Sequence, residues 1–137
     1  MTEFFAPYAH TLAALALWAL LQLGLAGVST VGKARARSAG GLPVRDYSDP
    51  AYRRHRAFQN AIETSGAFVA AAVAAMLTGG APFWVNLLAT LFLVARIATA
   101  AVHIGTEVQW LRSATWTLGF LCVIGLALIA LAGAFAA

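Results

Sequence analysis

The chain has 137 residues, of which 61% are hydrophobic and only 10% are charged, and its net charge is +4. A soluble domain of this size shows much more charged surface to water, so the composition excludes an ordinary soluble fold and indicates a lipid environment. The basic residues lie together in the sequence instead of being spread over a surface. This distribution excludes nucleic acid as a partner.

Four apolar segments are each long enough to cross a bilayer as an α-helix, which needs about 20 apolar residues. They cover residues 8–31, 55–78, 83–104 and 113–135. We therefore predict an all-α integral membrane protein, in which residues 1–137 form one four-helix bundle. The first helix should stay attached, because it lacks the basic start of a signal peptide and is too long for one.

Loop charges predict how the bundle is oriented in the membrane. Lysine and arginine concentrate in the first connection, residues 32–54, and recur at Arg112 in the third connection. Both ends of the sequence and the turn at 79–82 carry neither residue. By the positive-inside rule, the first and third connections face the cytoplasm and both termini face the other side.

The second helix carries small residues at every fourth position, namely Gly66, Ala70 and Ala74. This spacing lets helix backbones approach closely in lipid, where the hydrophobic effect does not drive helices together. Four thin, alanine-rich helices also have little interior of their own. We therefore interpret this face as a packing seam and expect the protein to form a homo-oligomer.

Polar side chains recur at helical spacing on the second and third helices. Arg56, Asn60 and Glu63 share one face of the second helix, and Arg96 stands well inside the apolar run of the third. An arginine near the bilayer centre costs about 2.5–3.5 kcal/mol on insertion scales, so it should face a protein partner or a wet cavity. The expected partner is Glu63. An ion pair that only fixes the helix register is the alternative.

More polar groups converge on the cytoplasmic half than such a register pair requires. They are Arg56, Gln59, Asn60, Glu63, Arg96, Thr99, His103, Arg112 and Ser113. Intramembrane ionisable residues indicate function, and the excess of cations suits an anionic ligand that enters from the cytoplasm. No second His or Cys stands at ligand spacing from His103, so we expect no metal. We expect Ser113 to cap the fourth helix, whose free amides would favour a carboxylate or thiolate.

Three segments together resemble the signature of one membrane family: Ser-Asp-Pro at 48–50, RAFQNAIE at 56–63 and LRSATWT at 111–117. The chain resembles the MAPEG family, the membrane-associated proteins in eicosanoid and glutathione metabolism. That family includes microsomal glutathione transferases and the inducible prostaglandin E synthase, and its members are trimers of four-helix protomers. The resemblance covers about the last ninety residues and implies a bacterial-type member in an inner membrane.

This resemblance implies that glutathione binds between adjacent protomers near the cytoplasmic side. The residues at matching ligand-binding positions are Arg56, Gln59, Asn60, Glu63, Arg96, Thr99, His103, Arg112 and Ser113. Arg35 matches a basic residue that the neighbouring protomer contributes. Arg112 and Ser113 match the positions where the family stabilises the thiolate, and a cation or hydroxyl beside a thiol does favour the ionised, nucleophilic form.

Three positions depart from the family pattern. Gln59 stands where the prostaglandin synthase has an arginine, His103 where many members have a tyrosine, and Thr99 where another histidine occurs. We therefore expect a glutathione-dependent transferase or peroxidase that attacks lipophilic electrophiles, and not a prostaglandin synthase. A non-catalytic binding or scaffold protein is the main alternative. A small drug and proton antiporter is less consistent, because such transporters need an acid within the first helix and none lies between Tyr8 and Val31.

Overall fold

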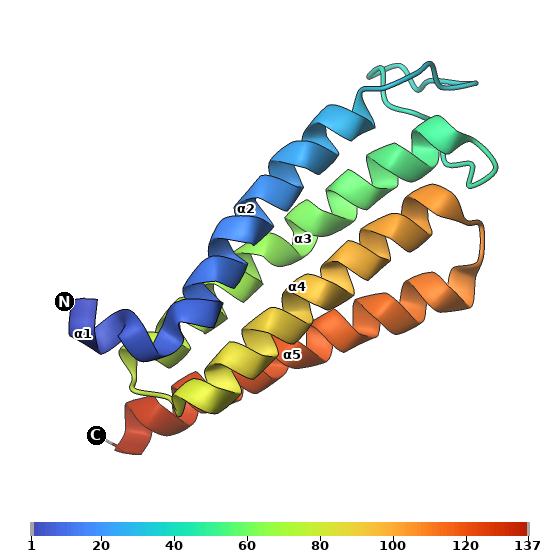
Figure 1. Ribbon diagram of the computed structural model, residues 1–137. Coiled ribbons are helices and arrows are strands. Elements are labelled where there is room, and N and C mark those ends of the chain that lie inside the picture. The colour runs from blue at the N-terminus through green and yellow to red at the C-terminus, as the bar shows by residue number, and fades with distance from the viewer. Residues whose placement is uncertain (1, 137) are drawn as a thin grey trace.

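The structure is a computed structural model that describes residues 2–136 as an antiparallel bundle of four long helices (Figure 1). The helices are α2 (Ala9–Ser29), α3 (Pro50–Leu77), α4 (Pro82–Gly105) and α5 (Gln109–Ala136). A short helix α1 (Thr2–Phe5) and the 3-10 turn η1 (Ala6–Tyr8) lead into α2. All four long helices are long and apolar enough to span a membrane. The predicted all-α, four-span fold is confirmed, and the described residues contain no named strand.

Two helices begin earlier than hydropathy predicted. Helix α3 starts at Pro50 and α5 at Gln109, whereas the apolar segments suggested starts near residues 55 and 113. Asp49 caps α3, because its carboxylate accepts a hydrogen bond of 2.9 Å from the amide of Ala51, and proline fits the first helical position. The polar first turns extend beyond the apolar runs, so hydropathy alone misses them.

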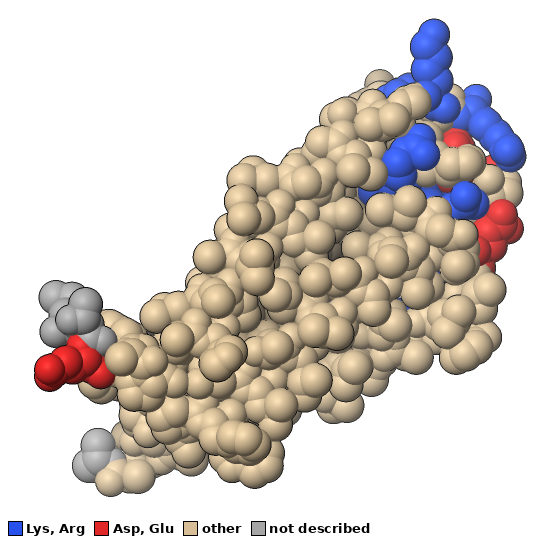
Figure 2. Space-filling view, in the orientation of Figure 1, with Lys and Arg blue, Asp and Glu red and all other residues tan. Residues whose placement is uncertain are grey.

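The two ends of the bundle differ in charge. The termini and the α3–α4 turn lie at one end, and the α2–α3 and α4–α5 connections lie at the other (Figure 1). Lysine and arginine gather at this second end, over the α2–α3 connection, with acidic side chains beside them, while the long flank visible in Figure 2 carries none. We call this end of the molecule the basic end.

The α3–α4 turn is tight because of Gly80. A Cβ at this position would lie 2.5 Å from a methyl carbon of Ile129 and 2.8 Å from the carbonyl oxygen of Ala75, so only glycine fits. The Tyr8 hydroxyl donates a hydrogen bond to the Gly80 carbonyl. This contact ties the start of α2 to the turn and closes the end of the bundle that holds the termini.

Three aromatic rings fill the middle of the bundle. Phe68 and Phe92 stack with their centroids 3.8 Å apart, and the edge of Trp18 meets the Phe92 ring at 5.2 Å. All three are almost fully buried. The Trp18 indole and the Gln22 amide both donate to the Ser65 hydroxyl, which satisfies polar groups that lipid cannot.

Two of the three residues of the predicted packing seam do not pack inside the bundle, whereas the third, Ala74, packs against its core. Gly66 and Ala70 are exposed, and a Cβ added at Gly66 would meet nothing within 4 Å. The alanines of α3 that are buried are Ala51, Ala57, Ala61, Ala71, Ala72 and Ala75. The small-residue face of α3 is therefore uncovered at Gly66 and Ala70.

The cap of α3 should make the basic end sensitive to acid. Hydrogen bonds from the amides of Arg35 and Ala51 hold the pKa of Asp49 below its ordinary value of 3.8. A lowered folded-state pKa means that the stabilisation is complete above pH 3.8 and is lost as the pH falls through the folded pKa. We expect faster hydrogen exchange of these two amides below pH 3.8, relative to an Asp49→Asn variant at each pH. Identical profiles for the two proteins would contradict the prediction.

Candidate functional site

A cavity of about 570 Å³ opens at the basic end, between α3 and α5. The connection before α3 and the last turn of α4 complete its wall. Its lining residues are Arg45, Tyr47, Arg56, Asn60, Glu63, His103, Gln109, Arg112, Ser113, Trp116 and Thr117. The volume lies within the range of about 300–1,000 Å³ that is usual for small-molecule sites.

Helix α3 supplies an ion pair to the cavity wall. The Arg56 guanidinium donates to both carboxylate oxygens of Glu63, at 2.7 and 3.3 Å. The two residues are seven apart, so they lie two turns away from each other on one helical face. The expected pairing of Glu63 with Arg96 is wrong, because Arg56 on the same helix reaches the carboxylate.

Arg96 is instead buried behind the cavity wall, with only 3% of its surface exposed. Its Nη2 donates to the Asn60 carbonyl oxygen at 2.8 Å and also to the Asn60 side-chain oxygen. Gly119 of α5 makes room for it, since a Cβ there would lie 3.1 Å from the Arg96 Cδ. Arg96 therefore orients the Asn60 amide and does not line the cavity.

Arg112 lies in the first turns of α5 with only 8% of its surface exposed. Its guanidinium carbon stands 3.9 Å from the centroid of the Tyr47 ring, a cation–π contact. Its Nη1 is buried and has no hydrogen-bond partner among the described residues. No ion pair between residues 2 and 136 involves Arg112, so its charge remains available to a ligand.

Ser113 lies in the second turn of α5 and is not its cap, because the helix begins at Gln109. The prediction that Ser113 caps this helix is therefore wrong. Its side chain still lines the cavity beside Arg112. The hydroxyl can donate a hydrogen bond to a ligand, but the helix-start amides do not surround it.

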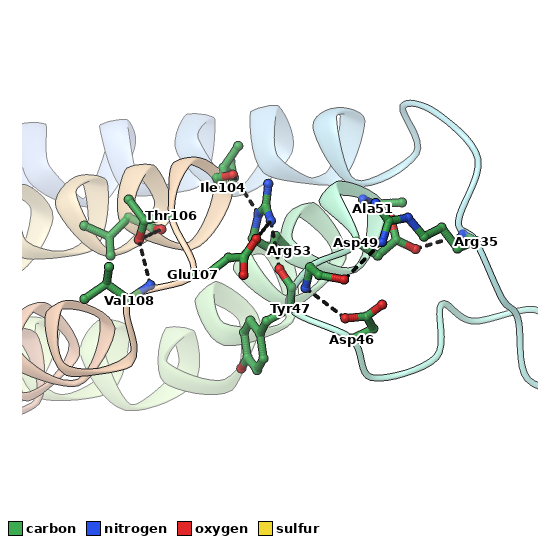
Figure 3. A network of polar contacts seen from close by, with 12 residues as sticks. Arg35, Asp46, Tyr47, Asp49, Ala51, Arg53, Ile104, Thr106, Glu107 and Val108 are labelled. Atoms are coloured by element: carbon green, nitrogen blue, oxygen red, sulfur yellow. Dashed lines mark hydrogen bonds and ion pairs between the residues drawn. The ribbon is translucent and has the colours of Figure 1, made fainter.

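A network around Arg53 holds the connection that delivers Tyr47 (Figure 3). Arg53 donates to the carbonyl oxygens of Tyr47 at 2.8 Å and Ile104 at 3.1 Å, and it pairs with Glu107 at 3.3 Å. One side chain of α3 thereby joins both connections at the basic end. The Tyr47 ring is fixed over Arg112 as a result.

Arg35 belongs to the same network and does not line the cavity. Its amide donates to the Asp49 carboxylate at 2.8 Å, and its guanidinium donates to the Ser48 hydroxyl at 3.0 Å. Gln59 is half-buried on α3 and also lies outside the lining. Thr99 is buried and donates to the Ala95 carbonyl at 2.7 Å, so it is internal to α4.

Six of the ten predicted site residues meet at the cavity: Arg56, Asn60, Glu63, His103, Arg112 and Ser113. Helical spacing could have found three that were missed, because Gln109, Trp116 and Thr117 lie three or four positions from Arg112 and Ser113. Arg45 and Tyr47 carried no such signal, since they lie in a connection without helical periodicity.

The electrostatics of the cavity favour an anionic ligand. Three arginines line it against one glutamate, and that glutamate is already paired with Arg56. Within the described chain, no three His, Cys, Asp or Glu side chains are grouped so that they could hold a metal ion. A thiol or carboxylate near Arg112 would be stabilised in its charged form.

Comparison with protein-family models identifies the family of this chain. A model of the MAPEG family matches residues 8–132, nearly the whole chain. The chain belongs to the MAPEG family. Its four membrane-spanning helices and the matched range make it an integral membrane protein of that family, whose members are concerned with glutathione-related transferase and isomerase chemistry. A search of the curated proteins finds no match to this MAPEG protein.

Proposed function

We propose that this MAPEG protein is a glutathione-dependent transferase or peroxidase that activates a thiol and attacks lipophilic electrophiles. The observation that carries the proposal is the unpaired cation Arg112, buried at the wall of a cavity that opens at the basic end. Family membership supports glutathione-related chemistry in general. The cavity residues support the finer assignment.

Glutathione matches the chemistry of the lining. It carries two carboxylates and one ammonium group, and arginine side chains recognise carboxylates through paired hydrogen bonds. Arg45, Arg56 and Arg112 offer such donors, and Glu63 is the single carboxylate of the lining that can pair with an ammonium group. The Asn60 amide suits the peptide groups of the tripeptide.

The reaction would begin with ionisation of the glutathione thiol. Arg112 stabilises the developing negative charge on sulfur, and the Ser113 hydroxyl can donate a hydrogen bond to it. Lowering a thiol pKa by two units requires about 2.7 kcal/mol of differential stabilisation. The thiolate then attacks an electrophile that arrives laterally through the lipid. The residues themselves supply these interactions.

A homotrimer would complete this site, with Arg35 of a neighbouring protomer as a further cation. Two observations support the proposal. Arg35 does not line the cavity of its own chain, and Gly66 and Ala70 of the packing seam are exposed. The charge of the basic end supports a cytoplasmic location for it, with both termini on the opposite side of a bacterial inner membrane.

The seam gives a direct test of assembly. Gly66→Leu should weaken subunit association by about 1–3 kcal/mol, because overpacking separates helices that need close approach. Ala101→Leu is the control, since Ala101 is exposed on α4. Mass measurement in detergent should show smaller particles for Gly66→Leu alone. Unchanged trimers in both variants would remove the seam from the interface.

Thiolate absorbance tests the function itself. Glutathione should give a saturable thiolate signal when titrated into detergent-purified protein, and a generic electrophile added afterwards should consume it as conjugate. A Cys122→Ala background removes the only protein thiol, which is buried in α5. Glu63→Ala should weaken binding. Binding without thiolate would favour the non-catalytic scaffold, and no binding would refute the assignment to glutathione.

A further inference from the structure

The imidazole of His103 is held in one tautomer. Its Nδ1 lies 2.9 Å from the carbonyl oxygen of Thr99, one turn earlier on α4. A carbonyl oxygen only accepts hydrogen bonds, so Nδ1 must carry the hydrogen. In the neutral ring, Nε2 then carries a lone pair.

Nε2 is also the atom of this ring that is free to meet a ligand. His103 lines the cavity, and its Nε2 makes no hydrogen bond with any described residue. Among the described residues, the fully buried side-chain nitrogens without a partner belong to Arg96 and Arg112. Nε2 of His103 also lacks a partner but is not fully buried. Because Nδ1 is engaged by the helix backbone, Nε2 is the ring nitrogen that is left to interact with a ligand in the cavity.

Other potential bases of the cavity are already occupied. Both carboxylate oxygens of Glu63 accept from Arg56, and the side-chain oxygen of Asn60 accepts from Arg96. The hydroxyls of Ser113, Thr117 and Tyr47 and the amide of Gln109, which also line the cavity, are much weaker bases than an imidazole. His103 is therefore the unengaged base of this site.

We propose that His103 is the general base that removes the thiol proton, a catalytic role that rests on the proposed thiol chemistry. The S–H bond breaks, its electron pair stays on sulfur, and the proton forms a new N–H bond at Nε2. The thiolate then forms an S–C bond with the electrophile, whose leaving group departs with its bonding electrons. The proton passes from Nε2 to that leaving group or to water.

Neighbouring charges limit how long the proton stays. Burial disfavours a positive imidazole at this position, and so do the cations Arg112 of α5, Arg56 of α3 and Arg96 of α4. Glu63 of α3 is paired with Arg56. An anionic sulfur beside the imidazole would offset this cost. The two roles are thus distinct: Arg112 sets how much thiolate exists, and His103 sets how fast it forms.

Rapid mixing with glutathione in weakly buffered indicator solution tests the assignment on the wild-type protein. Thiolate absorbance should appear before the proton reaches the medium, because His103 holds the proton first. Simultaneous appearance of thiolate and proton would overturn the role of His103 while leaving the proposed function intact. A complete lack of thiolate would overturn both.

A variant of His103 provides a second test of the assignment. His103→Gln should slow thiolate formation about 10²-fold or more, in line with the usual contribution of a general base. Added imidazole should restore the rate, and proton release should no longer lag. His10→Gln is the matched control, because His10 is exposed at the opposite end of the bundle. A wild-type rate in His103→Gln, or no response to imidazole, would refute the proposal.

Discussion

Replacing Arg112 with leucine should lower the turnover of glutathione with an electrophile about 10²–10³-fold. The guanidinium is buried, carries no ion pair within residues 2–136 and lines the cavity. A preorganised donor aimed at developing charge in such a site is worth about 2.7–4 kcal/mol. The measurements are kcat and the thiolate absorbance at saturating glutathione, and both should fall.

Arg56→Leu provides the contrast to this variant. Arg56 is neutralised by Glu63, so its loss should raise the KM for glutathione more than it lowers kcat. Tyr47→Phe should behave like wild type because it keeps the ring over Arg112, whereas Tyr47→Ala should lose part of the kcat. Arg112→Leu with unchanged kcat would contradict the role of this cation.

Asn60→Ala should destabilise the protein by about 1.5–3 kcal/mol. It removes the side-chain oxygen that accepts a hydrogen bond from Arg96, whose guanidinium is buried and already has one unpartnered nitrogen. A hydrogen bond to a charged group contributes about 1.5–3 kcal/mol to stability, and no water inside a bilayer replaces the lost partner of the charge. Thermal unfolding in detergent measures the loss.

A double-mutant cycle measures the interaction energy between Asn60 and Arg96 separately from their other contacts. In an Arg96→Met background, Asn60→Ala should cost much less, because the charge that needed the amide oxygen is gone. Equal costs in both backgrounds would show that Asn60 acts through other contacts. Gln59→Ala is the control, since Gln59 is a neighbouring polar residue of α3 outside the cavity.

Hydrophobic segments were sufficient to predict the fold, because lipid permits so few backbone arrangements. The helix starts at Pro50 and Gln109 lay outside that signal. They depend on capping and on connections that leave the apolar region. The residues on one face of α3 were also predictable, since helical spacing alone places Arg56, Asn60 and Glu63 together.

Which side chains of the site pair with each other was harder to predict than which side chains belong to the site. Two carboxylate oxygens of Glu63 could reach either of two arginines, and periodicity does not decide between a partner on the same helix and one on the next. Tyr47 was missed for another reason. Its position is set by the long-range contacts of Arg53 with Ile104 and Glu107, which no local pattern reveals.

The pairing of Arg56 with Glu63 has a consequence for which molecules the cavity admits. An anion that binds Arg56 breaks the ion pair and leaves the Glu63 carboxylate without a partner. A cation that binds Glu63 likewise leaves the Arg56 guanidinium without a partner. Either exchange trades one ion pair for another and gains little. A zwitterion with both charges at the right separation replaces one internal pair with two external ones. The ion pair between Arg56 and Glu63 therefore favours ligands that carry both a positive and a negative charge over ligands that carry only one.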